Sequence, residues 1–369
     1  MNILLINAIC YTSEYKNIQR AFSIKDTMIY DLCLAFKKQG HSVTLYAAEP
    51  YKPLNDEYYP FNIVWGKCIF KSIFLPNKFP FVKGIFNYIK NNRFDLIISS
   101  EVFSLCTLSA VLSNKNKLII WHELAKHNAI FRKIPSYIWY NFIARFFMKN
   151  CVVVARSEDA RDFISRYCSM TLSTFIDHGV NLDKFPCSTI KKDYFVVCSQ
   201  LIYRKRIDEI LKKFSLFLEY TNKKFSLYII GDGELRTKLE LLCYELGIAK
   251  YVYFFGKLSH SELIPILSQA KASLINTEKD NSMISIVESI AVATPVLTTP
   301  VPLNSRYIKQ YKLGIANEWN YKDLIEIVKN NEEYVRNCMS FRDYVSTNYK
   351  VKQFISIYDE FINNHTYKN

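Results

Sequence analysis

The sequence predicts an α/β protein built of two doubly wound domains. Its 369 residues suit two domains. A composition of 50% hydrophobic and 22% charged residues suits large hydrophobic cores that fold without stabilising disulfides or metal ions. The chain opens with a strand, a helix and a second strand, which is the unit from which doubly wound sheets are built. A strand, loop, helix and strand recur at residues 272–299, so the second half is expected to share this architecture.

The individual strands and helices are predicted from apolar runs and from the residues that end them. Residues 2–10 read as a buried strand, 24–39 as an amphipathic helix ending at Gly40, and 41–47 as the next strand. The loop from Asn7 to Ile24 contains no glycine, so the fingerprint of a dinucleotide site is absent. Further strands are expected at residues 94–99, 117–121, 151–155, 194–198, 225–230, 251–256, 272–275 and 296–299. Further helices are expected near residues 284–292, 322–335 and 351–362.

Charge and cysteine content narrow the classes of partner and compartment. The net charge is +14 and the pI about 9.1, with most of the basic excess in the first 187 residues. A strongly basic protein favours an anionic partner, whether a membrane surface, a nucleic acid or a nucleotide ligand. The ten cysteines include no C-x-x-C pair, and no apolar run approaches the roughly 18 residues of a membrane-spanning helix. A reduced, cytoplasmic protein is expected.

Two acid-free stretches in the first half interleave aromatic and basic side chains. They span Tyr58 to Phe94 and Lys126 to Lys149. Such a surface suits an anionic bilayer, because aromatic rings lie at the headgroup level and each Lys or Arg contributes about 1 kcal/mol. The alternative is that the aromatic side chains belong to the core and the lysines are solvated. Because the pattern occurs twice, it favours an anionic membrane surface as a partner.

Residues 274–301 form the segment that is most informative about function. An apolar strand ends at Ile275, a polar loop runs to Ser282, and a helix follows. The N-terminus of a helix at the carboxyl edge of a parallel sheet favours an anion. Asp280 and Glu288 lie on either side of this helix start, and carboxylates accept hydrogen bonds from sugar hydroxyls. The segment therefore predicts a nucleotide sugar, with the diphosphate on the helix end, the nucleoside on Glu288 and the sugar on Asp280.

This segment resembles the E-x7-E signature of the retaining, family-4 glycosyltransferases of GT-B fold, which is followed by A-x-G-x-P-V-V. Asp280 and Glu288 stand at the two ends of the signature, and Ala293 stands where the family has glycine. A left-handed helix cap at Ala293 would cost about 1 kcal/mol more than with glycine.

The resemblance extends to the start of the second domain. The segment Ser199 to Lys205 is similar to the family's G-R-L-x-x-x-K, whose Arg and Lys clamp the donor diphosphate. Lys205 is retained, Gln200 replaces the arginine, and Arg204 or Arg206 is expected to supply the missing cation. Through the resemblance, donor contacts are also expected at Gly231, Gly233, Lys257, Leu258, Ser282, Met283 and Ile284.

In the first half, His122 follows the strand at 117–121 and so lies at the ligand-binding edge of the sheet. The family carries a His followed by an acid here, and the resemblance implies that His122 lines the site near the transferred sugar. A structural histidine is the alternative. Catalytic roles are thus expected for His122, Asp280 and Lys205, with the backbone N–H groups of Met283 and Ile284 stabilising the leaving group. No metal site is expected.

The resemblance implies two Rossmann-like domains facing a cleft, with an acceptor-side domain at residues 1–187 and a donor-binding domain at 188–351. A helix at about 352–369 is expected to pack back on the first domain. The implied reaction moves a hexosyl or N-acetylhexosaminyl unit from a nucleoside diphosphate sugar, above all a UDP-sugar, to a glycan or polyprenyl-linked acceptor. It needs no metal or other cofactor and retains the anomeric configuration. Surface polysaccharide biosynthesis (capsule, O-antigen or lipopolysaccharide) at the inner face of the plasma membrane is the expected setting.

Two other classes of function stay open. A nucleotide-sugar epimerase shares the fold, and a basic nucleic-acid-binding protein would explain the net charge. The second is disfavoured, because the basic residues with a defined place lie on phosphate loops and aromatic stretches rather than along one stripe. No nucleic acid is therefore expected as a partner.

Overall fold

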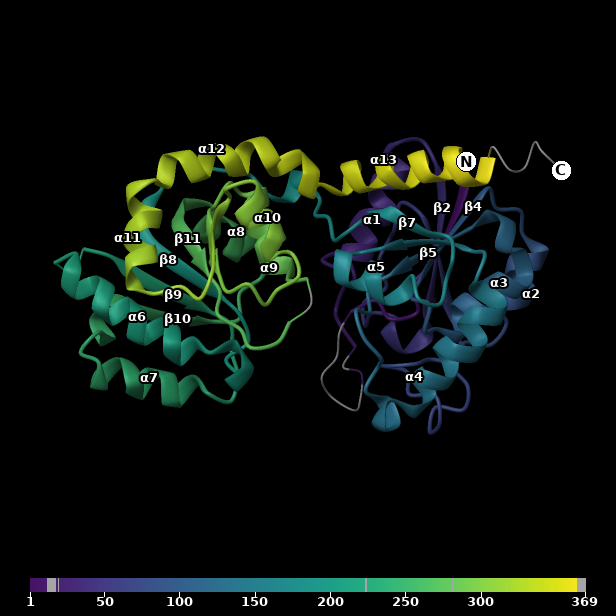
Figure 1. Cartoon of the computed structure of the whole chain (residues 1–369), viewed down its shortest axis with the longest axis horizontal. Helices are drawn as coiled ribbons and strands as arrows, with labels where there is room; N and C mark the ends of the chain where they lie inside the picture. The colour runs from purple at the N-terminus through teal and green to yellow at the C-terminus, as the bar shows by residue number, and fades with distance from the viewer. Residues whose placement is uncertain (12–17, 19, 223, 281, 364–369) are drawn as a thin grey trace. The chain divides into compact units, whose positions relative to one another are not determined.

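The computed structural model describes residues 1–11, 18, 20–222, 224–280 and 282–363. The chain divides into two compact units, one made of Met1–Asp177 with Thr347–Asn369 and the other of His178–Ser346. Each unit has one parallel sheet flanked by helices (Figure 1). The predicted α/β class with two doubly wound domains is confirmed.

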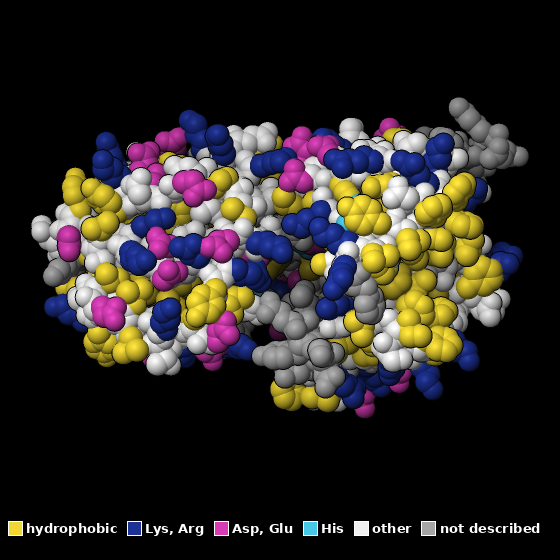
Figure 2. All heavy atoms as spheres, turned by 60° about the horizontal axis from the view of Figure 1, so that its bottom comes forward, with side chains coloured by type: hydrophobic (Ala, Val, Ile, Leu, Met, Phe, Trp, Pro, Cys, Tyr) yellow, Lys and Arg dark blue, Asp and Glu magenta, His cyan; other side chains and the backbone are white. Residues whose placement is uncertain are grey.

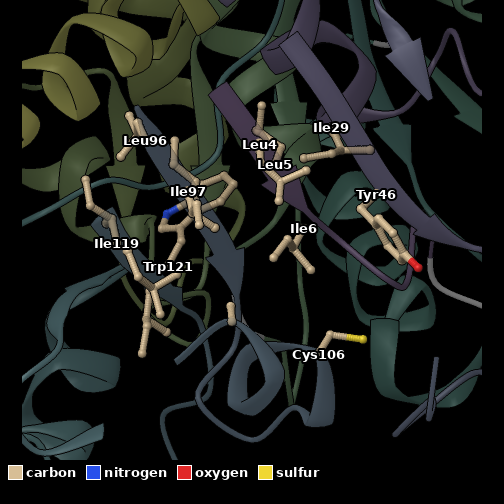
Figure 3. Close-up of a cluster of buried hydrophobic side chains, with 14 of the residues drawn as sticks. Leu4, Leu5, Ile6, Ile29, Tyr46, Leu96, Ile97, Cys106, Ile119 and Trp121 are labelled. Atoms are coloured by element: carbon tan, nitrogen blue, oxygen red, sulfur yellow. The ribbon is translucent and has the colours of Figure 1, made fainter. Parts of the chain in front are cut away.

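The first unit contains a seven-stranded sheet in the order β3-β2-β1-β4-β5-β6-β7. Its strands are β1 (Asn2–Ile6), β2 (Ser42–Ala48), β3 (Asn62–Gly66), β4 (Leu96–Ser100), β5 (Leu118–His122), β6 (Val152–Ala155) and β7 (Thr171–Phe175). Its helices are α1 (Met28–Lys38), α2 (Ile85–Asn91), α3 (Leu105–Asn114), α4 (Ile134–Ile138), the π-helix η4 (Trp139–Met148), α5 (Glu158–Ile164), α13 (Thr347–Ile357) and the π-helix η9 (Tyr358–Asn363). The central strands are apolar runs buried on both faces, and they supply the core drawn in Figure 3.

The second unit contains a six-stranded sheet in the order β10-β9-β8-β11-β12-β13. Its strands are β8 (Lys192–Cys198), β9 (Ser226–Ile230), β10 (Val252–Gly256), β11 (Ala270–Leu274), β12 (Val296–Thr298) and β13 (Gly314–Ala316). Its helices are α6 (Ile207–Tyr220), α7 (Arg236–Glu245), α8 (His260–Gln269), α9 (Ile284–Ala291), α10 (Ser305–Gln310), α11 (Tyr321–Lys329) and α12 (Asn331–Phe341), with 3-10 turns that include η6 (Tyr203–Lys205) and η8 (Arg342–Val345).

In both sheets the strand order reverses beside the first strand of the unit. β1 lies between β2 and β4, and β8 lies between β9 and β11. At such a switch point the connections leave on opposite faces of the sheet, and the carboxyl ends of the two strands border a crevice in which ligands bind. Ligand-binding residues are therefore expected on the loops after β1, β4, β8 and β11.

The sequence did not predict three strands, β3, β7 and β13, which are all edge strands. β7 contains no buried residue, and β3 contains one. A strand that is covered on few sides needs no continuous apolar run, so the signal that revealed the central strands is missing. The helix expected at 322–335 is two helices, α11 and α12, which meet at Asn330.

About half of the aromatic side chains in the first aromatic and basic stretch lie in the core of the first unit or pack against it. Phe79 stacks on Phe103 with ring centroids 4.4 Å apart and contacts Trp139 edge to face. Between Tyr58 and Phe94, Phe70 is the exposed exception among the phenylalanines, at 62%. For this stretch the alternative of core aromatics with solvated lysines holds.

The chain passes from the first unit to the second after residue 177, not 187. Val180 donates its backbone N–H to the carbonyl of Val345, and Arg342 donates to the carbonyl of Phe185 at 2.6 Å. These bonds tie residues 178–185 to the second unit. The chain returns to the first unit at Thr347, five residues before the expected position.

Helix α13 packs against α1 of the first unit. Phe354 lies 6.2 Å from Phe36 and 5.4 Å from Trp121 between ring centroids. Lys350 of this helix forms an ion pair with Asp177, and both side chains are 1% exposed. Burial lowers the pKa of Lys350, and the charge of Asp177 opposes that shift.

Ala293, after the end of α9, adopts a φ of 59° and is fully buried. It is the left-handed cap that the sequence suggested at this position. Its N–H donates to the Ile290 carbonyl, and the N–H of Thr294 donates to the Ser289 carbonyl, which closes the helix. The chain therefore carries about 1 kcal/mol of backbone strain at this cap.

Lys350→Met is expected to destabilise the first unit by about 3–5 kcal/mol, because it removes the buried cation that pairs with the Asp177 carboxylate. Combining it with Asp177→Leu should restore most of the loss, since an apolar pair in this place needs no ion pair. Urea unfolding of the single and double variants measures both effects. Lys52→Met, at the exposed Lys52–Asp56 pair, is the matched control and should cause no measurable change. Equal stability of Lys350→Met and the wild type would show that the pair contributes nothing.

Candidate functional site

Two loops of the second unit meet at the switch point between β8 and β11. Asp280, on the loop after β11, accepts hydrogen bonds from Arg204 Nη1 at 2.6 Å and from Lys205 Nζ at 2.8 Å, both on the loop after β8. Lys205 and Asp280 are 75 positions apart in the chain. The strand order, which makes β8 and β11 neighbours, is what brings them together.

Further hydrogen bonds fasten these two loops to each other. The Arg204 carbonyl accepts from the backbone N–H of Glu278 at 2.9 Å. The Thr277 hydroxyl oxygen lies 3.1 Å from that carbonyl and 2.5 Å from Asp280 Oδ2. Arg206 pairs with Glu278 at 2.5 Å. Of the two arginines considered from the sequence, Arg204 is the one beside Asp280.

Asp280 is ionised between two cations. Burial raises the pKa of its carboxyl group, but hydrogen bonds from Lys205, Thr277 and Arg204, together with the charge of Lys205, hold that pKa below its ordinary value. Lys205 is 8% exposed, so its charge is poorly screened by water. Two cations and one carboxylate leave a net positive charge at the end of these strands, which suits an anionic ligand.

The start of α9 supplies further hydrogen-bond donors. The Met283 N–H, which was expected to face the leaving group, donates to Asn304 Oδ1 at 3.0 Å, and Asn304 Nδ2 donates back to the Met283 carbonyl at 2.8 Å. The next N–H groups, of Ile284 and Ser285, precede the helix's own hydrogen bonds. Within the described residues, the buried Ser285 hydroxyl has no hydrogen-bond partner. These donors gather on the first turn of the helix.

Glu288 lies in the second turn of α9 with its side chain 7% exposed. Its Oε1 lies 3.1 Å from Nε2 of His260, the first residue of α8. A carboxylate can only accept a hydrogen bond, so His260 donates it. The sequence did not single out His260, because the contact spans 28 positions and no spacing rule links the two residues.

The two glycines predicted to contact the donor shape the neighbouring loop. A Cβ atom at Gly231, whose φ is 133°, would lie 1.8 Å from the Ser199 carbonyl oxygen, and one at Gly233 would lie 2.5 Å from the Leu201 carbonyl oxygen. Both glycines therefore allow the turn after β9 to pack on the backbone of the loop after β8. The other predicted donor residues differ in exposure, since Gln200 and Lys257 are exposed and Leu258 and Ser282 are half-buried.

In the first unit, His122 is the last residue of β5, and its side chain is fully buried. Its Nδ1 lies 3.0 Å from Glu101 Oε2, although off the direction of a hydrogen bond, and its ring faces Phe163 at 6.2 Å. A contact between His122 and a sugar stays a prediction. The carboxylates at this edge that are partly exposed are those of Glu101 and Glu123, at 24% and 28%.

Glu101 was missed by the sequence analysis. It follows β4 at the switch point and has a φ of 68°, a conformation that strains any residue other than glycine. Its Oε1 accepts the N–H of Glu123 at 2.7 Å, and Glu123 in turn pairs with Arg156 at 2.8 Å. Strain of this kind gathers at functional sites. The one sequence signal was an acid directly after a buried strand.

Two further properties of the described part of the chain bear on function. No group of three or more His, Cys, Asp or Glu side chains there could hold a metal ion. No described helix is long and apolar enough to cross a membrane.

Comparison with known proteins identifies the class that this fold and site define. The family model described as Glycosyltransferase Family 4 matches residues 26–184, and the model described as Glycosyl transferases group 1 matches residues 184–341. The chain belongs to the family-4 glycosyltransferases of GT-B fold.

Three relatives illustrate the range of this family. An uncharacterised glycosyltransferase of Methanocaldococcus jannaschii is 30% identical over 41% of this chain and 37% of its own length. The alpha-monoglucosyldiacylglycerol synthase of Streptococcus pneumoniae is 24% identical over 78% of this chain and 70% of its own. The lipopolysaccharide glucosyltransferase WaaG of Escherichia coli is 26% identical over 34% of this chain and 33% of its own. The chain thus matches about a third of the length of two of these relatives.

Solved structures support the fold. WaaG, a glycosyltransferase involved in lipopolysaccharide biosynthesis, superposes with a TM-score of 0.59 at 14% identity, covering 92% of this chain and 95% of its own. Anabaena HepE in complex with UDP gives 0.65 at 11% identity, covering 96% and 100%. The sucrose-phosphate synthase of Thermosynechococcus elongatus gives 0.67 at 15% identity, covering 98% and 99%.

The lowered pKa of Asp280 predicts a pH-dependent contribution to stability. At pH 7 its contacts should stabilise the second unit, so Asp280→Asn should lower the free energy of unfolding by on the order of 1–3 kcal/mol. As the pH falls below about 4, where an unfolded Asp takes up its proton, this advantage shrinks and then disappears. Urea unfolding at pH 7 and pH 3 measures it, with Asp193→Asn at an exposed position as the control. A difference that persists undiminished at pH 3 would contradict the assignment.

Proposed function

We propose that the chain is a retaining glycosyltransferase that moves a sugar from a nucleoside diphosphate sugar to a saccharide acceptor. One observation carries the proposal. The Asp280 carboxylate is held between Arg204 and Lys205 beside the start of α9, and Glu288 lies one turn further along the same helix. This arrangement offers cations for a diphosphate and carboxylates for hydroxyl groups in one unit.

Lys205, Arg204 and the first turn of α9 bind the diphosphate in this proposal. Lysine has three donors and arginine five, so both cations can bind phosphate oxygens while still holding Asp280. The N–H groups of Ile284 and Ser285 and the Ser285 hydroxyl face the same anion. These donors stabilise the negative charge that develops on the departing nucleoside diphosphate. The reaction then needs no metal ion and no other cofactor.

The two carboxylates divide the remaining donor contacts. Glu288, one turn beyond the phosphate, accepts from the ribose hydroxyls, because the ribose is joined directly to the diphosphate. Asp280, before the helix, accepts from hydroxyls of the transferred sugar. The family resemblance adds that the departing phosphate assists deprotonation of the acceptor, so that no separate general base is required.

The donor is a UDP-sugar and the acceptor a glycan or lipid-linked saccharide, in a pathway that builds surface polysaccharide. Structural neighbours support the donor class, since HepE was solved with UDP and with UDP-glucose. The names of the relatives, a monoglucosyldiacylglycerol synthase and a lipopolysaccharide glucosyltransferase among them, support the acceptor class.

Separate substitutions at the two carboxylates test the donor site. Glu288→Gln should weaken UDP binding by roughly 1.5–3 kcal/mol, because charged hydrogen bonds to the ribose are lost. Asp280→Asn should spare UDP binding, since the amide oxygen can still accept a hydrogen bond from one of the two cations, and should reduce turnover of the UDP-sugar. Calorimetry with UDP and a turnover assay measure the two effects, with Asp193→Asn as control. If Asp280→Asn loses UDP and Glu288→Gln keeps it, the roles are reversed; if neither changes binding or turnover, the site is wrong.

The epimerase alternative is separated by product analysis. Incubation of the protein with the UDP-sugar alone should give slow hydrolysis and no epimeric nucleotide sugar, because a transferase needs its acceptor. Conversion of the UDP-sugar to its epimer would contradict the proposed transferase function and support the epimerase alternative.

The helix pair α4–η4 is the surface of the first unit suited to an anionic membrane. Its exposed apolar side chains include a row at intervals of four residues, formed by Ile134, Ile138, Phe142 and Phe146 at 54–79% exposure. Exposed basic side chains lie at both ends, Arg132 and Lys133 before the row and Arg145 and Lys149 near its end. Figure 2 shows hydrophobic side chains gathered over this unit with Lys and Arg around them. This combination supports the proposal that the protein associates peripherally with the anionic inner face of the plasma membrane.

Replacing Lys133 and Lys149 together by Ala should weaken binding to vesicles of phosphatidylglycerol by about thirtyfold, since each basic residue contributes about 1 kcal/mol at an anionic surface. Phe146→Glu should weaken it as well, whereas Tyr244→Glu, at a position 74% exposed in the second unit, should not. Sedimentation with vesicles at low and high salt measures the effect, and salt should reduce wild-type binding. Equal binding to anionic and neutral vesicles would contradict the proposal.

A further inference from the structure

Among the described residues, His260 is the side chain with a hydrogen bond to the Glu288 carboxylate. Its Nε2 lies 3.1 Å from Glu288 Oε1, and its own side chain is 33% exposed while that of Glu288 is 7% exposed. The contact therefore lies at the margin of the protein interior, where the second carboxylate oxygen can still meet a ligand.

The start of α8 holds His260 in a fixed place. Ser259 and Glu262 form a capping box, in which the Ser259 N–H donates to Glu262 Oε2 at 2.8 Å. The His260 ring lies against Phe185, with centroids 6.1 Å apart. Arg342 donates to the Phe185 carbonyl and to the Ala291 carbonyl at the end of α9, each at 2.6 Å. Through Arg342, Phe185 is thus joined to α9, the helix that carries Glu288.

We infer that His260 is a positioning residue that makes the nucleotide site selective for ribose over deoxyribose by orienting the Glu288 carboxylate. The inference rests on the proposed role of Glu288 at the ribose. A carboxylate on a flexible side chain accepts from two neighbouring hydroxyls at once only if its plane is fixed. His260 fixes one oxygen by donating a single hydrogen bond and leaves the remaining lone pairs to the ligand. A lysine or arginine in its place would bind the carboxylate with a full charge and more donors, in competition with the ribose.

Two substitutions separate the hydrogen bond of His260 from its packing. His260→Leu keeps an apolar side chain against Phe185 and removes the donor. His260→Gln restores a donor at a similar distance from the backbone, because its amide nitrogen reaches about as far as Nε2 of histidine. Ser261→Ala, on the same turn, is the matched control.

The test is calorimetry of UDP and of 2′,3′-dideoxy-UDP with the wild type and each variant. His260→Leu should bind UDP about tenfold more weakly, a loss typical of one charged hydrogen bond, and should bind dideoxy-UDP as the wild type does. His260→Gln and Ser261→Ala should stay within about threefold of the wild type for both ligands. This pattern shows coupling between His260 and the ribose hydroxyls.

Other outcomes overturn the inference. Unchanged UDP binding by His260→Leu, equal losses for both ligands, or no rescue by His260→Gln would each show that His260 does not act through the ribose. The proposed function would survive these results if Glu288→Gln still binds UDP more weakly than the wild type. If the wild type binds neither UDP nor dideoxy-UDP, the proposed function fails together with the inference.

Discussion

The proposed donor site depends on one carboxylate that contacts two neighbouring basic side chains from another loop. Asp280 accepts hydrogen bonds from Arg204 and Lys205, and the Arg204 carbonyl accepts in return from the segment that leads to Asp280. Without the carboxylate, two cations at the end of neighbouring strands would repel each other at close range. With it, both are held in place before any ligand arrives. The entropy cost of ordering these long basic side chains is thereby met during folding, so a diphosphate bound as proposed would lose less of its binding free energy.

Part of this site could be predicted because several of its residues lie within short, recognisable sequence segments. A buried strand, a polar loop and a helix start place Asp280 and Glu288 correctly, and the family signature points to Lys205. What the sequence could not predict are partners joined only by the tertiary fold. His260 and Asn304 belong to no spacing rule, and each contacts a predicted site residue at least 21 positions away in the chain. In the first unit, Glu101 likewise accepts the N–H of Glu123, 22 positions away. The hydrogen bond from the Met283 N–H to Asn304 was not foreseen for the same reason, since Asn304 follows β12 and lies 21 positions further along the chain.

The fold was predictable where burial is complete and unpredictable where it is partial. β1, β4 and β5 read as apolar runs because helices cover both faces of the sheet, whereas the edge strands β3, β7 and β13 carry mixed side chains. The two aromatic and basic stretches show the same limit. They look alike as sequences, yet Phe79 of the first is half-buried against the core and Phe146 of the second is 79% exposed. Composition alone does not distinguish an inward from an outward ring.

The return of α13 to the first unit makes residues 178–346 an insertion within another domain. During synthesis the inserted unit is complete while the first still lacks the helix that contributes Phe354 and Lys350, so the second unit in the sequence is able to fold first. Until α13 arrives, Asp177 has no Lys350 beside it, and part of the apolar surface around Trp121 is open to solvent. Exposed apolar surface of this kind makes an incompletely folded domain prone to aggregation. A chain that ends before residue 347 would contain a complete second unit and a first unit that lacks α13.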